Sequence, residues 1–419
     1  MFMLRYVLFV KLIKHSARTG LLLALGCILW ASKLPLSPKP QILFLHYPTQ
    51  QITGIGVYLI NCSKLLRERG YTPYFLVIKN SQFQKELEKN TLPFDTVPLS
   101  SYNNIRALTS IIHKTCAEHH SDVICCNWYD HSLAAAQAVA RDRSLKVIFI
   151  DHMNIAAMAN QETHKLLNSL DGILGVNPLI VSTLADRQVN APTIAFIPPF
   201  FDEDRFLNFS LSDRYRRLNL HQARVLFFRE TFGIALQKLP VICMIANMYE
   251  DRTKNHQLLF QAIHRLIHKN KPVEVMLAGD GAMRPKLEQL ADLLKIKKYV
   301  HFLGFTDRIP ELLYFTDFHV LSSRHEAFGI VHVEAAFMKK VSVGATNTGA
   351  PAIIKDGITG LIFENDNAED LARKIEFLID HPALCHEMGK SAYAHALLNF
   401  SNNAKIQAFE KFLCHVTGH

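Results

Sequence analysis

Short apolar segments alternate with helix-like segments along residues 41–205, and the same alternation starts again near residue 240. These apolar segments lack the polar alternate positions of a strand that faces water, so we predict strands that are buried on both faces. Parallel sheets covered by helices meet this requirement. The predicted strands are 41–47, 73–79, 122–128, 146–151, 172–176 and one starting at Thr193 in the first series, and 240–247, 273–281, 299–305, 318–323 and 341–346 in the second.

The two series predict an α/β chain with two doubly wound, Rossmann-like domains that face each other across a ligand cleft. A length of 419 residues supports this, because it exceeds what one ordinary core accommodates. The expected parts are a first domain over 41–205, a second over 206–395, and a C-terminal helix over 396–419 that can pack back on the first domain. Further helices are expected at 254–269, 282–295, 307–315, 328–339 and through most of 367–416.

Residues 1–40 differ from the rest of the chain, because they are basic and apolar and contain no acidic residue. The run "GLLLALGCILWAS" is shorter than the roughly 20 apolar residues that cross a bilayer comfortably. A signal peptide, a short signal anchor and an amphipathic segment in the membrane interface all fit this pattern. We favour membrane association through residues 1–34 without cleavage, with the catalytic domains in the cytoplasm.

Charge and cysteine usage narrow the class of partner. The net charge of +9 favours anionic ligands such as phosphates or anionic lipid. Nucleic acid is not expected, because the basic excess is concentrated at the N-terminus without interleaved stacking aromatics. The eight cysteines form no C-x-x-C pair, which indicates reduced, buried thiols in a reducing compartment. No histidine pattern typical of a zinc site is present, so we predict no metal.

The stretch "HEAFGIVHVEA" over residues 325–335 carries two glutamates, Glu326 and Glu334, in otherwise apolar surroundings. A helix that is apolar nearly all round is usually buried, and a buried carboxylate needs a partner. With a helix starting near Phe328, the N–H groups of Phe328, Gly329 and Ile330 would face the cleft and bind an anion. Glu334 could then accept hydrogen bonds from a vicinal diol, and Glu326 from further hydroxyls.

Two more loops follow predicted strands on the cleft side. Gly54 and Gly56 open the first helix, and glycines let a backbone approach a ligand closely. Their pattern is not a dinucleotide fingerprint, because Leu59 stands where a third glycine is needed. Arg252 and Lys254 follow the first strand of the second series and can place positive charge beside a phosphate.

His152 follows the fifth strand of the first series, in "FIDHMN". The carboxyl ends of parallel strands border the ligand cleft of such folds. A lone histidine is often structural, but its place at a strand end makes His152 a candidate catalytic residue.

Taken together, the sequence resembles the retaining GT-B glycosyltransferases of glycosyltransferase family 4, over about residues 41–400. Glu326 and Glu334 are similar to the E-x7-E signature of that family. Other matching segments are "KNH" at 254–256, "GDG" at 279–281, "ATNTGAPAII" at 345–354 and "TGLIF" at 359–363.

The resemblance implies transfer of a sugar from a nucleotide diphosphate sugar, with retained anomeric configuration and without a metal or other cofactor. By position, Glu334 would bind the nucleotide ribose, Glu326 the donor sugar and Lys254 the diphosphate. Gly54 and Gly56 would approach the phosphates from the first domain, and His152 would lie beside the donor sugar and the acceptor.

The sequence departs from the family pattern at Asn247, where an arginine is usual, so the diphosphate has one fewer cation and Arg252 is a candidate substitute. The acceptor is expected to be a glycan or a lipid-linked molecule, because residues 1–34 suit a membrane surface. Two alternatives remain open. One is a nucleotide-sugar epimerase or glycan phosphorylase on the same scaffold. The other is a membrane-bound sugar- or lipid-binding protein without turnover.

Overall fold

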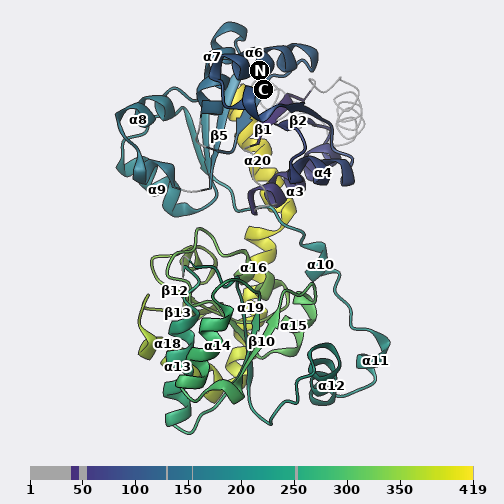
Figure 1. Ribbon diagram of the computed structural model, residues 1–419, viewed down its shortest axis with the longest axis vertical. Helices are drawn as coiled ribbons and strands as arrows, with labels where there is room; N and C mark the ends of the chain where they lie inside the picture. Colours follow the sequence, from purple (N-terminus) through teal and green to yellow (C-terminus); the bar gives the residue numbers. More distant parts are fainter. Residues whose placement is uncertain (1–38, 47–53, 129–130, 153, 251–252, 419) are drawn as a thin grey trace, which may run out of the picture. The chain divides into compact units, whose positions relative to one another are not determined.

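The computed structural model describes residues 39–46, 54–128, 131–152, 154–250 and 253–418, coloured along the chain in Figure 1. The expected membrane-associating segment and Arg252 lie outside these residues. In the part of the chain that is described, no helix combines the length and apolarity needed to cross a bilayer.

The first sheet has seven parallel strands in the order β3-β2-β1-β4-β5-β6-β7. The chain moves outward from β1 in one direction and then in the other, which is the doubly wound topology with its switch point between β1 and β4. The strands are β1 Gln41–Leu45, β2 Thr72–Ile78, β3 Phe94–Val97, β4 Val123–Cys126, β5 Lys146–Asp151, β6 Gly172–Gly175 and β7 Thr193–Phe196. The intervening helices are α3 Gly54–Glu68, α4 Gln82–Lys89, α5 Leu99–Tyr102, α6 Ile105–Glu118, α7 His131–Arg143, the 3-10 helix η1 Ile155–Met158, α8 Gln161–Asn168 and α9 Pro178–Asp186.

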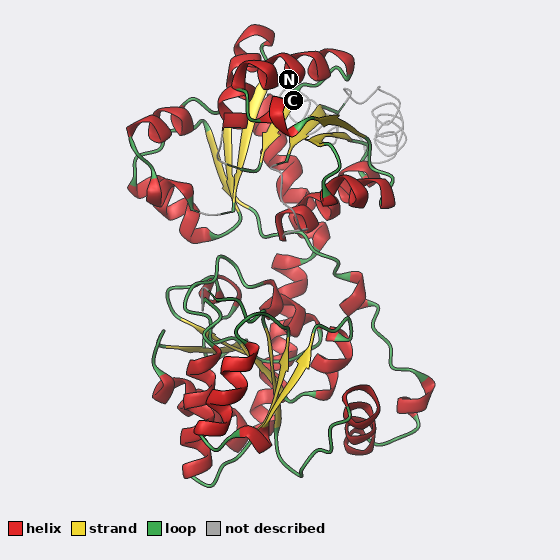
Figure 2. Ribbon diagram, in the orientation of Figure 1, coloured by secondary structure: helices red, strands yellow, loops and turns green. Residues whose placement is uncertain are grey.

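The second sheet has six parallel strands in the order β10-β9-β8-β11-β12-β13, which repeats the same winding. Its strands are β8 Val241–Ile245, β9 Glu274–Ala278, β10 Val300–Gly304, β11 Phe318–Val320, β12 Ser342–Ala345 and β13 Gly360–Phe363. Its helices are α10 Asp204–Leu207, α11 Asp213–Arg216, α12 Leu220–Phe232, α13 His256–His268, α14 Arg284–Leu293, η2 Lys297–Tyr299, α15 Ile309–Phe315, α16 Ile330–Phe337, α17 Ala350–Ile353, α18 Ala368–Asp380 and α19 Pro382–Phe400. Figure 2 shows helices flanking the strands of each sheet.

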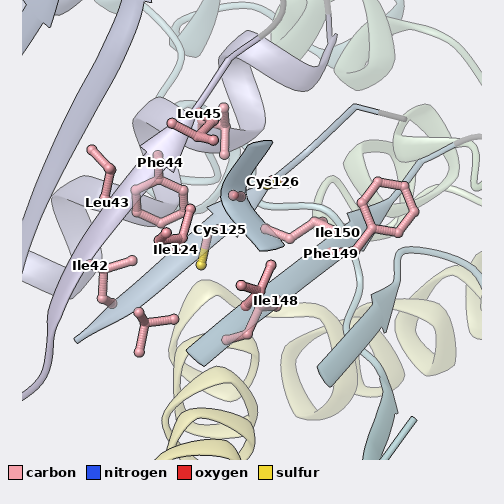
Figure 3. Packing of buried hydrophobic residues seen from close by; sticks show 14 of the residues in the cluster. Ile42, Leu43, Phe44, Leu45, Ile124, Cys125, Cys126, Ile148, Phe149 and Ile150 are labelled. Atoms are coloured by element: carbon pink, nitrogen blue, oxygen red, sulfur yellow. The ribbon is translucent and has the colours of Figure 1, made fainter. Parts of the chain in front are cut away.

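The prediction of two parallel, Rossmann-like sheets is therefore confirmed. Figure 3 shows why these segments read as continuous apolar runs: the side chains of β1, β4 and β5 pack together, with Phe44, Cys125 and Ile148 among them. Two strands were not expected. The four residues of β3 include the polar Asp95 and Thr96 at a sheet edge, and the four residues of β13 are too short to stand out.

The last helix, α20 Asn402–Thr417, packs on the first sheet although it follows the second in sequence (Figure 1, yellow). Ile406, Phe409 and Phe412 are buried in the same core as β1 and β4. A side chain at Gly172 of β6 would collide with Phe412, so the glycine allows the helix to lie close to the strand. The predicted domain limits at 205 and 395 stay a prediction, and residues 41–418 form one compact unit.

Candidate functional site

A cavity of about 580 Å³ lies at the carboxyl ends of strands from both sheets. This size is in the range of sites that hold a ligand of drug or nucleotide dimensions. Most of the predicted site residues line it. From the first sheet side come Gly54, Ile55, Tyr58, His152, Val176 and Pro199, and from the second come Ile245, Ala246, Asn247, Lys254, Ala278, Gly279, Phe305, Thr306, Ile309, Glu326, Ala327, Phe328, Gly329, Ile330 and Val331.

On the first sheet side, His152 follows β5 and meets the ring of Tyr58 from α3 in an edge-on contact, with ring centroids 5.0 Å apart. Burial, aided by the nearby His46, lowers the pKa of His152 to about 3. The imidazole is therefore neutral at physiological pH, and it can donate or accept a hydrogen bond without adding positive charge. Gly54 also lines the cavity, whereas Gly56 is buried in α3 and does not.

On the second sheet side, Lys254 and Glu326 form an ion pair, with Lys254 Nζ 2.5 Å from Glu326 Oε2. The side chains are 31% and 15% exposed, so the pair is partly sheltered from water and is aimed into the cavity rather than into bulk solvent. The hydroxyl of Ser323 also approaches Glu326 Oε2, at 3.4 Å. Glu326 Oε1 receives no hydrogen bond from any residue within the described ranges, so one oxygen is left for a ligand hydroxyl.

The loop before α16 presents backbone N–H groups to the same cavity. Gly329 has a φ of 90°, a left-handed conformation that no β-branched or bulky residue adopts easily. The helix accordingly begins at Ile330 rather than at Phe328, which corrects the expected start by two residues. Within the described chain, the N–H groups of Phe328 and Gly329 donate no hydrogen bond, and that of Ile330 has no partner inside the helix. These groups can bind an anion as predicted.

A second loop fixes the position of this anion-binding loop. Gly349 donates its N–H to the carbonyl of Glu326 at 2.8 Å. A Cβ at Gly349 would lie 2.3–2.6 Å from backbone atoms of Phe328, so only glycine permits this approach. The loop that carries Glu326 and the loop at 345–349 are therefore one packed unit, and the orientation of the N–H groups depends on both.

Glu334 lies on α16 one turn beyond Ile330, and it is not among the residues that line the cavity. Protein atoms surround its carboxylate on most sides, although the residue keeps some exposure. Burial raises the pKa of Glu334 to about 7, and the guanidinium of Arg205 opposes this rise only in part. Among the residues that the structure describes, none donates a hydrogen bond to the carboxylate. A half-buried acid without a donor is unfavourable unless a ligand supplies one.

The other predicted residues have different surroundings. Asn247 follows β8 and lines the cavity, and its amide nitrogen donates to the hydroxyl of Tyr249 at 3.0 Å. Asn255, next to Lys254, donates its amide N–H to Asp366 Oδ1 and accepts a hydrogen bond from the Ser322 hydroxyl at its carbonyl. These two hydrogen bonds fix the start of α13. Among the described residues that line the cavity, Lys254 is the only lysine or arginine.

Several lining residues were not predicted from the sequence. Tyr58 lies inside a helix, and Phe305, Thr306 and Ile309 follow β10. Phe305 is 71% exposed and lines the cavity, so its ring is accessible to a ligand there. Its position directly after a strand was the signal that could have identified it. Arg205, which acts on Glu334, had no sequence signal, because the two residues are far apart in the chain.

Comparisons with known proteins agree with this geometry. Residues 228–395 match the family model of glycosyl transferases group 1. The alpha-D-kanosaminyltransferase of Streptomyces kanamyceticus is 28% identical over 188 residues, which are 44% of this chain and 47% of that enzyme, so the match spans about half of its length. The N-acetyl-alpha-D-glucosaminyl L-malate synthase of Bacillus anthracis is 25% identical over 388 residues, covering 87% of this chain and 94% of that enzyme.

Among solved structures, HepE of Anabaena in complex with UDP and glucose superposes with a TM-score of 0.72 at 20% identity, covering 90% of this chain and 99% of that one. At this identity the likeness shows the fold. The superposition with HepE agrees with the two parallel sheets described above. Residues 228–395 are therefore similar to the glycosyl transferases group 1 family, and the chain has the GT-B fold.

Proposed function

We propose that the protein transfers a sugar from a nucleotide diphosphate sugar to a hydroxyl group of an acceptor, with retention of the anomeric configuration. The observation that supports this most is the carboxylate of Glu334, which has no hydrogen-bond donor within the described structure although it is partly buried. It lies one helical turn behind free N–H groups that suit a diphosphate. A ribose diol attached to that diphosphate would supply the missing donors.

The diphosphate leaves with negative charge, and two groups are placed to stabilise it. Lys254 supplies a cation, and the N–H groups of Phe328 to Ile330 supply fixed dipoles at the start of α16. Such preorganised donors typically contribute about 3 kcal/mol each to the stability of a transition state. Because Glu326 already pairs with Lys254, it can hold the ammonium in place while its second oxygen accepts a hydroxyl of the donor sugar.

The nucleoside base would extend towards the loop after β10. Arg205 donates to the carbonyl of Asp307 at 2.7 Å and also influences Glu334, which brings that loop and the proposed ribose site together. Phe305 and Ile309 offer apolar surface there, and an aromatic side chain is a suitable contact for a base. Which base binds depends on polar contacts that a bound ligand would make.

Given retention, the first sheet side of the cavity favours a single-step substitution over a covalent intermediate. Its described lining residues include no carboxylate, and Glu326, the acid that lines the cavity from the second sheet, is paired with Lys254. A covalent intermediate on a side-chain carboxylate therefore lacks an obvious nucleophile. The acceptor hydroxyl would instead attack from the side of the leaving diphosphate and give its proton to a phosphate oxygen, with the neutral His152 orienting a hydroxyl nearby.

We further propose a glycan or lipid-linked acceptor, with residues 1–34 at a membrane surface and the two sheets on the cytoplasmic side. The basic, apolar composition of residues 1–34 supports this. So do the cysteines: none of the seven in the described residues is in a disulfide, and six of them are buried.

A donor screen tests the proposal. The full chain is incubated with UDP-, GDP- and ADP-sugars, with and without candidate acceptors, and nucleotide release, product identity and anomeric configuration are measured. We expect acceptor-dependent release and a retained product. Inverted product contradicts retention. Epimerised sugar or sugar 1-phosphate indicates the epimerase or phosphorylase alternative, and nucleotide binding without turnover indicates the binding protein.

A further inference from the structure

Three polar atoms in the first sheet are sealed from solvent and have no hydrogen-bond partner among the described residues: His46 Nε2, His152 Nε2 and the hydroxyl of Tyr58. An unpaired buried polar atom destabilises the fold, because it has lost its hydrogen bonds to water. Several such atoms in one neighbourhood deserve a common explanation. His46 follows β1, His152 follows β5, and Tyr58 lies on α3 against the ring of His152.

The strand register places His46 and Asn127 in one row across the sheet. Leu45 pairs with Cys126, and Cys126 pairs with Phe149, so His46, Asn127 and Ile150 form the next row across β1, β4 and β5. His152 follows directly after the last residue of β5, where its ring contacts Tyr58, and His46 is near enough to help lower the pKa of His152. Figure 3 shows the three strands that end at this row.

The hydrogen-bond partners of Asn127 determine which nitrogen of His46 carries the proton. The amide nitrogen of Asn127 donates to the carbonyl of Leu45 at 2.6 Å. A carbonyl can only accept, so this contact fixes the orientation of the amide. The amide oxygen of Asn127 then faces His46 Nδ1 at 3.2 Å, and it too can only accept. His46 must donate through Nδ1–H, which leaves Nε2 as a lone pair.

That lone pair needs a donor, and the side chain cannot turn to find one. His46 is 4% exposed and Asn127 is 2% exposed, and the His46 ring packs on Phe83 with centroids 4.1 Å apart. Burial lowers the pKa of His46 to about 4, so the ring stays neutral and keeps its lone pair at physiological pH. No direct hydrogen bond joins His46 Nε2 to His152 Nε2 in the described structure. One buried water that also contacts the Tyr58 hydroxyl would link the lone pair of His46 to the Nε2–H of His152.

We propose that His46, oriented by Asn127, is a positioning residue that holds His152 in the Nε2-protonated tautomer, so that His152 presents the Nδ1 lone pair to a substrate hydroxyl in the cavity. Of the two ring nitrogens of His152, Nε2 is the one sealed from solvent, and the residue lines the cavity. His152 thus accepts a hydrogen bond from a hydroxyl instead of donating one. The hydroxyl's role as substrate rests on the proposed function, but the tautomer does not.

The hydroxyl has two possible sources, the transferred sugar and the acceptor, and kinetics separates them. If it belongs to the donor sugar, loss of the His46 contact slows both donor hydrolysis without acceptor and transfer with acceptor. If it belongs to the acceptor, transfer slows and hydrolysis does not. In both cases nucleotide affinity stays unchanged, because the proposed nucleotide contacts lie on the second sheet.

The test uses the full chain with 15N-labelled histidine. Long-range 1H–15N spectra report the tautomer of each ring, and His152 is identified by the signal lost in His152→Gln. We expect the Nε2–H tautomer in the unmodified protein and a shift towards Nδ1–H in His46→Phe, with kcat lowered about 10- to 100-fold. His46→Gln, which keeps an acceptor oxygen near the Nε2 position, should retain the tautomer and much of the activity.

Phe83→Leu is the matched control, because it loosens the packing on the His46 ring and leaves the polar chain intact. It should lower thermal stability without changing the tautomer of His152. An Nδ1–H tautomer in the unmodified protein, an unchanged tautomer in His46→Phe, or an equal change in Phe83→Leu would each overturn the proposal. A shifted tautomer in a chain without transferase activity would keep the positioning role and refute the proposed function.

Discussion

Replacing Glu334 by glutamine should make the protein more stable at high pH while it abolishes nucleotide binding. In the folded chain the pKa of Glu334 rises from 4.5 to about 7, because burial disfavours the carboxylate. This rise corresponds to about 3 kcal/mol of unfavourable ionisation in the folded state. Because the residue keeps some exposure, we expect about 1–3 kcal/mol to be recovered by the neutral amide.

The sign follows from the two pKa values. Below pH 4.5 the carboxyl group is protonated in both the folded and the unfolded chain, and no penalty exists. Between pH 4.5 and about 7 the unfolded chain releases this proton while the folded protein keeps it, so stability falls over that range and stays lowered above it. The gain from Glu334→Gln should therefore be small at pH 5 and complete above about pH 8.

Urea unfolding followed by circular dichroism at pH 5 and pH 8.5 measures the gain, and calorimetry with nucleoside diphosphates measures the binding. Glu387→Gln is the control, because Glu387 is exposed on α19 and pairs with Lys390. In the unmodified protein, affinity should also rise between pH 6.5 and 8.5, since the diol binds the ionised form. An equal gain at both pH values would refute the burial argument. Retained nucleotide binding in Glu334→Gln would refute its role as the ribose ligand.

Three other substitutions address the rest of the site. Lys254→Met should lower kcat about 100-fold, the loss expected for one charge-stabilising donor, and an unchanged kcat would remove Lys254 from the diphosphate site. Gly349→Ala should destabilise the fold by about 1–3 kcal/mol in thermal unfolding and weaken nucleotide binding, because its Cβ would collide with the backbone of Phe328. Asn247→Arg adds a cation at the end of β8 and should tighten nucleoside diphosphate binding about 3- to 10-fold in calorimetry. Weaker binding would indicate that the diphosphate lies elsewhere.

The two sheets could be predicted because their central strands are buried on both faces and consist almost entirely of apolar residues, as in "QILFL" and "KVIFID". Among the edge strands, β7 and β10 were predicted, whereas β3 and β13 were not; β3 mixes polar residues into its four positions. The start of α16 was misplaced by two residues, because sequence spacing does not reveal that Gly329 takes a left-handed conformation.

The candidate site could be predicted where a residue directly follows a strand, as His152 and Asn247 do, because all carboxyl ends of a parallel sheet meet at one edge. Residues that reach the site from within a helix, or from a distant part of the sequence, could not be predicted. Tyr58 reaches the cavity from the first turns of α3, and Arg205 reaches Glu334 from a short helix 129 positions earlier in the sequence. The sequence around Tyr58 and the sequence around Arg205 contain no pattern that indicates these positions.

The two glutamates of the "HEAFGIVHVEA" stretch belong to one motif but differ in whether the protein supplies a partner for the carboxylate. Glu326 has its cation within the protein, so its carboxylate is held in place before any ligand arrives. Glu334 has no donor of its own in the described chain and lies where burial disfavours its charge. A ligand that brings two hydroxyls to Glu334 relieves an existing cost, whereas one that brings a hydroxyl to Glu326 Oε1 meets a carboxylate whose charge Lys254 already balances. Affinity for the nucleotide should therefore depend mainly on Glu334, and the orientation of the sugar for transfer mainly on the Lys254–Glu326 pair.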